Sequence, residues 1–90
     1  MSTLMVNYDL MKPGQNYDDL IEYIKGVGAW WHYLQSTWFV RTNMSPTELR
    51  DKLNTFIDTN DKVLVVDMHT RAWAASGFPS KAYDWLRENL

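Results

Sequence analysis

The sequence predicts a single α+β domain, residues 1–90, in which strands and helices follow the order βαββαβ with a short helix added at the end of the chain. Three observations support this prediction. Four segments show either apolar–polar alternation or runs of β-branched and aromatic residues. Two segments with helical spacing of apolar residues lie between them, and each of these begins with a capping residue. The length suits one domain and is too short for two.

The first strand and the first helix are predicted from residues 4–28. Every second residue from 4 to 10 is apolar or aromatic, and these residues form one face of a strand: Leu4, Val6, Tyr8 and Leu10. Asp9 ends this strand on its other face. A turn follows at residues 12–15, where Pro and Gly stop regular structure. Asn16 is the expected N-cap of a helix that ends at Gly26 and Gly28.

Two further strands are predicted over residues 30–34 and 37–42, which are rich in aromatic and β-branched residues. They are joined by a tight turn at Gln35 and Ser36, as expected for a hairpin. The second helix starts with the strongest local signal in the chain. Ser45 and Glu48 have the spacing of a capping box, and Pro46 occupies the first helical position between them. The apolar stripe of this helix comprises Leu49, Leu53, Phe56 and Ile57.

The last third of the chain adds a strand and a short helix. A polar loop at 58–61 precedes a continuous apolar run at 62–68, and such a run predicts a central strand covered on both faces. Residues 69–78 show an irregular pattern. Residues 80–89 are predicted as a helix with three inward residues: Ala82, Trp85 and Leu86.

This order of elements predicts a ferredoxin-like fold. Two interleaved right-handed βαβ crossovers form a four-stranded antiparallel sheet with both main helices on one face. The opposite face is expected to be open. We therefore expect a partner chain or a ligand to lie on that face.

Composition excludes several classes of function. The formal net charge is −2, and the nine Lys and Arg residues form no cluster, so a long nucleic acid is not the expected partner. A small phosphate-bearing ligand needs only one or two of them. The chain has no Cys and only two His, which excludes His/Cys metal sites and thiol chemistry. The chain also lacks a basic leader and a long apolar run, so a cytoplasmic protein without a membrane segment is expected.

Asp9 is the main candidate for chemistry because its side chain is expected on the open face or at a dimer interface. In a symmetric dimer, two copies of Asp9 could approach each other and hold a divalent metal through oxygen ligands. The alternative is structural: Asp9 ends the strand and accepts hydrogen bonds from the turn that follows it. The residues alone leave both interpretations open.

Several of these motifs resemble known families. Tyr8-Asp9 at a strand end and the segment 34–40 (LQSTWFV) resemble the small CRISPR-associated nuclease of the spacer-acquisition complex and the related VapD-type toxins. Short bacterial and phage proteins labelled SinR-like are more similar still. They share the Tyr8-Asp9-Leu10 and Lys12-Pro13-Gly14 turn, Trp31-His32 and Ser36-Thr37-Trp38. The likeness spans residues 4–68.

The resemblance implies a ferredoxin-like homodimer in which Asp9 is the catalytic residue and a ligand of Mg²⁺ or Mn²⁺. It also implies that Gln35 and Ser36 are hairpin residues. The nuclease family has a basic first helix, whereas this chain carries three acidic residues and one Lys there: Asp18, Asp19, Glu22 and Lys25.

The hairpin supplies aromatic candidates for ligand binding. By alternation, Trp31 and Tyr33 share one face of their strand, while Trp38 lies on the next strand. Exposed rings of this kind seal a dimer or stack on a base. His32 is either a hydrogen-bonded core or interface residue, or a phosphate donor or general acid. Ser36, in the turn between the strands, completes this set of ligand-binding candidates.

Basic side chains supply the remaining candidates. Lys12, near Asp9, and Arg41, on the third strand, are the expected phosphate contacts. His69 and Arg71 follow the fourth strand, where irregular chain can form the rim of a site. A single Lys or Arg such as Lys12 or Arg41 is more often an ordinary solvated charge, and the segment from His69 to Arg71 is by itself weak evidence for a site.

Three functional hypotheses follow. The first is a homodimer that binds a small nucleotide or short oligonucleotide at an aromatic-lined interface or open sheet face, and so sequesters a signalling nucleotide; binding of this kind needs no cofactor. The second is a metal-dependent endonuclease or phosphodiesterase that uses Asp9 from each subunit. The third is an interaction module that docks a host protein on its open sheet or edge strand.

Overall fold

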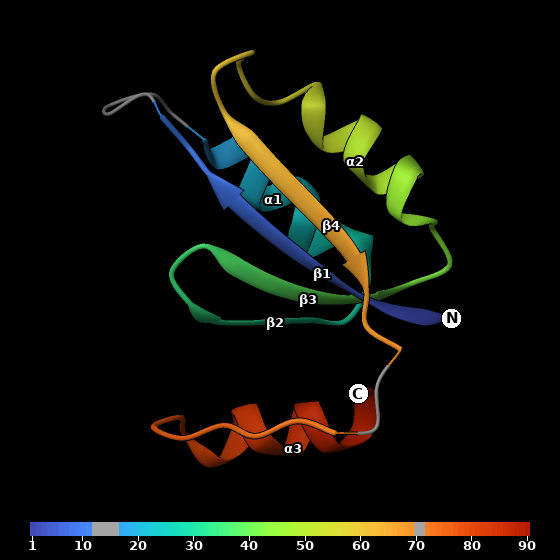
Figure 1. Ribbon diagram of the computed structural model, residues 1–90, viewed down its shortest axis with the longest axis vertical. Coiled ribbons are helices and arrows are strands. Elements are labelled where there is room, and N and C mark those ends of the chain that lie inside the picture. Colours follow the sequence, from blue (N-terminus) through green and yellow to red (C-terminus); the bar gives the residue numbers. More distant parts are fainter. Residues whose placement is uncertain (12–16, 70–71) are drawn as a thin grey trace.

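The computed structural model describes residues 1–11, 17–69 and 72–90. Figure 1 shows the elements in chain order: β1 (Ser2–Asp9), α1 (Asp18–Val27), β2 (Trp30–Leu34), β3 (Thr37–Thr42), α2 (Pro46–Asn54), β4 (Lys62–Asp67) and α3 (Ser80–Asn89). This order confirms the predicted α+β class and the ferredoxin-like fold with an added C-terminal helix.

The sheet is antiparallel, with strand order β2-β3-β1-β4. β1 and β3 are therefore the central strands, and β4 is an edge strand that pairs with β1 alone among the described residues. The prediction of a central, doubly covered fourth strand was wrong. Its apolar run divides between the two faces instead: Val63 and Val65 pack against the core under the helices, whereas Leu64 is 56% exposed.

The main core lies between the sheet and the two helices α1 and α2. The predicted inward residues of β1 meet those of β3, and both sets are fully buried against two residues from each helix: Leu4, Val6, Trp38, Val40, Leu20, Ile24, Leu49 and Leu53. Burial of this apolar surface is the main contribution to stability in a domain of this size. The alternation that predicted the face of β1 is therefore confirmed.

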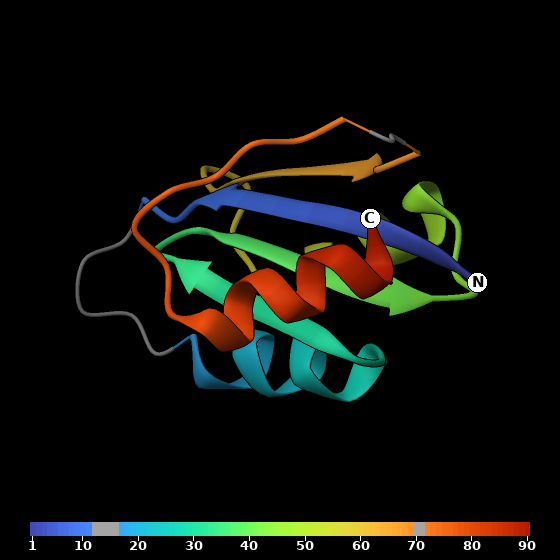
Figure 2. The ribbon, with the colours of Figure 1, turned by 90° about the horizontal axis from the view of Figure 1, so that it is seen from below.

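The opposite face of the sheet is covered in part by α3, which lies in front of β2 and β3 in Figure 2. Trp31 is the centre of this second core, where it packs against Ala82 and Leu86 and donates from Nε1 to the carbonyl of Ala82 at 3.1 Å. The expectation of a wholly open face therefore has to be corrected. α3 packs mainly on β2 and β3 and reaches β1 at Thr3, whose hydroxyl donates to the Asn89 carbonyl.

The ends of the helices follow local chemistry. In α2 the capping box is present, with the Ser45 hydroxyl accepting from the Glu48 amide and the Glu48 carboxylate accepting from the Ser45 amide, both at 3.1 Å. In α1 the cap position is Tyr17, without a side-chain hydrogen bond, and the predicted cap Asn16 lies outside the described residues. The helix continues through Gly26 and ends at Val27, with Gly28 as its C-cap.

Gly28 is required by a close backbone contact rather than by its dihedral angles. Its φ of 170° is extended backbone, open to any residue. However, a Cβ atom at this position would lie 2.0 Å from the Arg41 carbonyl oxygen. The connection from α1 to β2 can therefore pass over β3 only where no side chain is present.

None of the helices that the structure describes is both long and apolar enough to cross a bilayer.

Candidate functional site

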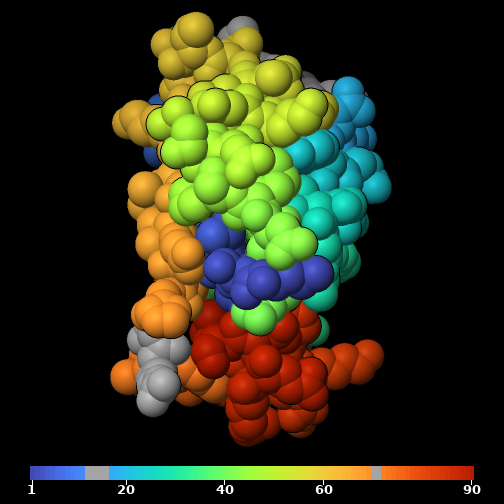
Figure 3. All heavy atoms as spheres, turned by 90° about the vertical axis from the view of Figure 1, so that its right-hand side faces the viewer, coloured from blue at the N-terminus to red at the C-terminus, as the bar shows by residue number. Residues whose placement is uncertain are grey.

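Two neighbouring hollows lie at one end of the sheet, around the start of β1. Figure 3 faces this end and shows the first residues of β1 (blue) between the start of α2 (green) and α3 (red). Arg41, near the end of β3, is connected by hydrogen bonds to β1 and to α3. Its Nη1 donates to the Thr3 hydroxyl at 3.2 Å, and that hydroxyl donates in turn to the Asn89 carbonyl at 2.5 Å. Thr3 is only 3% exposed, so the two hydrogen bonds that connect Arg41 to α3 meet at the hydroxyl of a buried residue.

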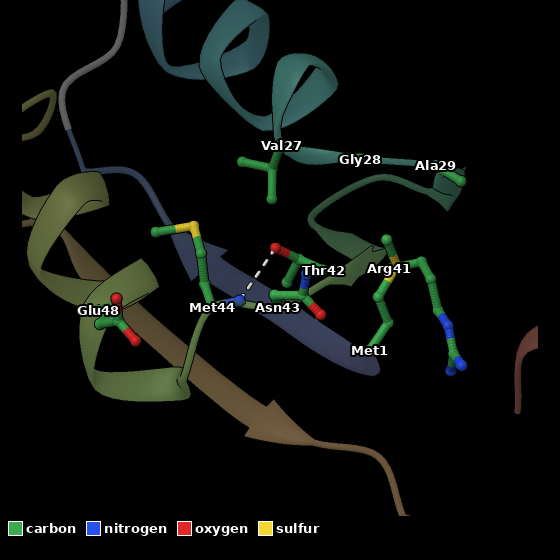
Figure 4. A pocket seen from close by; sticks show the side chains of 9 residues that line it. All are labelled: Met1, Val27, Gly28, Ala29, Arg41, Thr42, Asn43, Met44 and Glu48. Atoms are coloured by element: carbon green, nitrogen blue, oxygen red, sulfur yellow. Dashed lines mark hydrogen bonds between the residues drawn. The ribbon is translucent and has the colours of Figure 1, made fainter.

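The larger of two neighbouring hollows, here called the apolar hollow, has a volume of about 470 Å³. Figure 4 shows Val27, from the end of α1, pointing toward Thr42 and Met44. The backbone N–H of Met44 donates to the Thr42 hydroxyl at 3.2 Å. The remaining lining residues are Met1, Gly28, Ala29, Arg41, Asn43 and Glu48. Apolar walls with an amide and a carboxylate at the rim are typical of a site for a flat organic group.

The second hollow, here called the polar hollow, has a volume of about 430 Å³ and lies beside the last turn of α3. It shares Met1 and Arg41 with the apolar hollow. Its other lining residues are mostly polar: Ser2, Thr3, Asp67, Met68, His69, Glu88, Asn89 and Leu90. The polar hollow therefore combines two potential donors to an anion, Arg41 and His69, with two carboxylates that can accept hydrogen bonds.

The structure thus brings together two residues that the sequence suggested separately. Thr3 is the cross-strand neighbour of Arg41, and its carbonyl accepts from the Met68 amide at 2.8 Å. His69 is the residue after Met68, and it lines the polar hollow together with Arg41 from the other side of β1. Thr3, Glu88 and Asn89 complete this site, and no local pattern in the sequence distinguished them from ordinary strand and helix residues.

Two other predicted basic residues, Lys12 and Arg71, lie outside the described residues.

Asp9 lies at the far end of β1 from this site. It is exposed and lines a shallow depression of about 170 Å³ with Lys62, which is also its cross-strand neighbour in β4. Among the described residues no group of three His, Asp or Glu side chains could hold a metal ion. A cation opposite Asp9 also disfavours a second cation there. A metal ion at Asp9 would therefore need the second subunit that the resemblance implies, and this site stays a prediction.

The aromatic candidates divide between the two faces of the sheet instead of lining one surface. Trp31 lies under α3 and Trp38 in the main core, and their exposed fractions are 2% and 0%. The structure thus contradicts their assignment as accessible ligand-binding residues. Tyr33 packs against Trp31 with ring centroids 5.2 Å apart and remains 40% exposed. The face that carries Trp31 and Tyr33 is covered in part by the protein's own C-terminal helix.

His32 and Ser36 are held by the hairpin itself. The His32 ring stacks on Trp38, and its Nε2 lies 3.2 Å from the Gln35 carbonyl oxygen. The Ser36 carbonyl accepts from the Tyr8 amide at 3.1 Å, which extends the pairing of β1 and β3 to the turn. The predicted turn at Gln35 and Ser36 is confirmed, and these contacts give His32 a structural role.

Comparison of the chain with models of known protein families gave no match, and comparison with solved structures gave none either. The likeness to the CRISPR-associated and SinR-like proteins therefore rests on the sequence motifs alone.

Proposed function

We propose that this protein binds a small nucleotide across the two hollows, with the phosphate beside Arg41 in the polar hollow and the base in the apolar hollow. The observation that supports this proposal best is that Arg41 lines both hollows while Thr3 holds its guanidinium in place. The position differs from the aromatic-lined face expected from the sequence, whereas the class of ligand is the same.

The phosphate end of the proposed site depends on Arg41. A guanidinium presents donors in a planar fork that matches a phosphate, and here one of its nitrogens is already directed by the Thr3 hydroxyl. An arginine that is already oriented in this way loses less side-chain entropy on binding a phosphate than a freely rotating one. His69 adds a second donor, the N–H of its imidazole ring, from the other side of β1.

The sugar and base account for the remaining groups. The Glu88 carboxylate lines the polar hollow and suits sugar hydroxyls, which donate hydrogen bonds that a phosphate cannot. On the other side of Arg41, the side chains of Val27 and Met44 offer an apolar surface to a base. Each hollow is within the size range of small-molecule sites. The net charge of −2 favours one small phosphate ligand over a long nucleic acid.

Isothermal titration with linear and cyclic nucleotides tests the proposal. We expect one class of nucleotide to bind, and Arg41→Gln to weaken that binding at least about tenfold, because a hydrogen bond to a charged group contributes about 1.5–3 kcal/mol. Lys52→Gln is the matched control, since it removes the same charge from the exposed face of α2 and should leave affinity unchanged. If no nucleotide binds at high micromolar concentration, the proposed function is wrong.

The nuclease hypothesis has a separate test. It predicts Mg²⁺- or Mn²⁺-dependent cleavage of RNA or DNA that disappears in Asp9→Ala. Nucleotide binding at Arg41 predicts that Asp9→Ala leaves affinity unchanged, because Asp9 lies at the other end of β1. One pair of variants, at Asp9 and Arg41, therefore distinguishes the two functions.

A further inference from the structure

The outer edge of β4 carries unpaired backbone groups that follow from the strand register. The amide of Met68, the residue after β4, donates to the Thr3 carbonyl, so the backbone N–H and C=O groups of every second residue before it, Val66, Leu64 and Lys62, point toward β1. The N–H and C=O groups of Val63, Val65 and Asp67 must then point away from β1. Among the described residues no strand lies beyond them. An exposed edge of this kind pairs readily with another strand.

We infer that this edge pairs with β4 of a second copy of the chain, antiparallel and with a twofold axis at Val65. Val63 of each copy then lies opposite Asp67 of the other, and Val65 lies opposite its equivalent. Each outward N–H and C=O of these three residues gains a partner in this register. A register shifted by two residues leaves some of them without a partner, so backbone pairing selects the axis at Val65.

Side chains on the face opposite α1 and α2 support the same register. Leu64 and Val66 lie on this face, since their cross-strand neighbours are Asn7 and Met5. Pairing about Val65 puts Leu64 beside Val66 of the second copy. Leu64 is 56% exposed in the isolated chain, the largest exposed fraction of any apolar residue in β4. The dimer would remove this side chain from water without any change in the monomer core.

Charge complementarity on the helix face argues for a second copy rather than an unrelated strand. Arg50, Pro46 and Thr47 of α2 line a groove along Val63 and Val65, and the Arg50 side chain is 53% exposed. Asp67 of the second copy would lie opposite Val63, at the mouth of this groove. Each subunit would thus offer a carboxylate to the Arg50 guanidinium of the other. Within the described residues, this guanidinium pairs with its exposed neighbour Asp51.

This dimer also bears on Asp9. Asp9 is the cross-strand neighbour of Lys62, three residues from the axis at Val65. At about 3.4 Å per residue, the two copies of Asp9 would be roughly 20 Å apart along the strand direction. That separation is too large for two carboxylates to share one metal ion, whose oxygen ligands lie within about 2.6 Å.

Sedimentation velocity of the full chain from low micromolar to millimolar concentration tests this inference. We expect concentration-dependent dimers, and loss of the dimer in Leu64→Lys, because that change places a charge beside the partner's Val66. Tyr33→Lys is the control, since it replaces another exposed apolar residue far from β4. A wild-type chain that stays monomeric up to millimolar concentration would refute the inference.

A charge swap tests the register. Arg50→Glu and Asp67→Arg should each weaken the dimer roughly two- to fivefold, as expected for a partly exposed ion pair, and the double variant should restore wild-type association. Amide exchange measured by NMR gives an independent readout. The amides of Val63, Val65 and Asp67 should become protected as concentration rises, while the outward amide of Trp30 on the opposite edge should not. Protection at Trp30 alone would place the interface on β2 and overturn the proposal.

Discussion

The imidazole of His32 lies parallel to the indole of Trp38, with ring centroids 3.7 Å apart and an angle of 13° between the planes. The same indole donates from Nε1 to the Tyr8 hydroxyl at 3.1 Å. A side chain of the edge strand β2 is thereby linked through β3 to the central strand β1. The stack closes one side of the main core, where Trp38 is fully buried.

We predict that His32→Ala lowers the free energy of unfolding by about 1 kcal/mol or more, because it removes an aromatic stacking partner and exposes part of Trp38. His32→Phe should recover most of this loss, since the flat ring remains. Urea denaturation followed by tryptophan fluorescence measures both variants. His69→Ala is the matched control and should leave stability unchanged; equal losses in the two His variants would contradict a specific role for the stack.

The two glycines at the end of α1 should respond in opposite ways to alanine. Gly28→Ala brings a Cβ against the Arg41 carbonyl oxygen, and we expect a loss of about 1–3 kcal/mol from the resulting backbone shift. Gly26→Ala meets no atom within 4 Å and replaces a helical glycine, so a gain of about 0.5–1 kcal/mol is expected. Thermal unfolding of both variants gives the comparison, and two changes of the same sign would count against it.

The capping box of α2 should contribute measurably to stability. Ser45→Ala removes the acceptor for the Glu48 amide, and we expect a loss of about 1 kcal/mol. Thr47→Ala alters an exposed residue of the same helical turn and serves as the control, with a much smaller expected effect. Equal effects of the two substitutions in urea denaturation would show that helix propensity, and not the cap, accounts for the loss.

Asp61 should be the most sensitive polar residue in the chain. Its buried carboxylate accepts from the backbone amides of Met11 and Asp58 and from the Tyr17 hydroxyl, at 2.7 Å, 2.9 Å and 3.1 Å. Asp61→Ala leaves these donors without their acceptor, and a loss of about 3 kcal/mol or more is expected. Asp84→Ala, which removes an exposed ion pair with Arg87, should cost about 1 kcal/mol or less. Chemical denaturation of both variants checks the contrast.

The candidate site could be predicted only in part. Arg41 and His69 were recognisable as chemically capable residues, but their proximity depends on β1 lying between β3 and β4. Thr3 contacts both neighbouring strands through one hydroxyl and one carbonyl, and nothing in its local sequence indicates this. The aromatic residues were misassigned for a related reason. Alternation grouped Trp31 with Tyr33 on one face of their strand, whereas the helix that covers this face comes from residues 80–89.

Local patterns in the sequence by themselves determined the order of the elements, the capping box at Ser45 and Glu48, and the inward face of β1. These features depend on interactions between residues only a few positions apart, so composition and spacing encode them directly. Tertiary structure alone decided that β4 is an edge strand, that α3 covers Trp31, and that Arg41 and His69 line one hollow. Each of these features depends on contacts between segments that are distant in the chain. An apolar run such as residues 63–66 is compatible both with a central strand and with an exposed edge strand, so the run alone could not place β4.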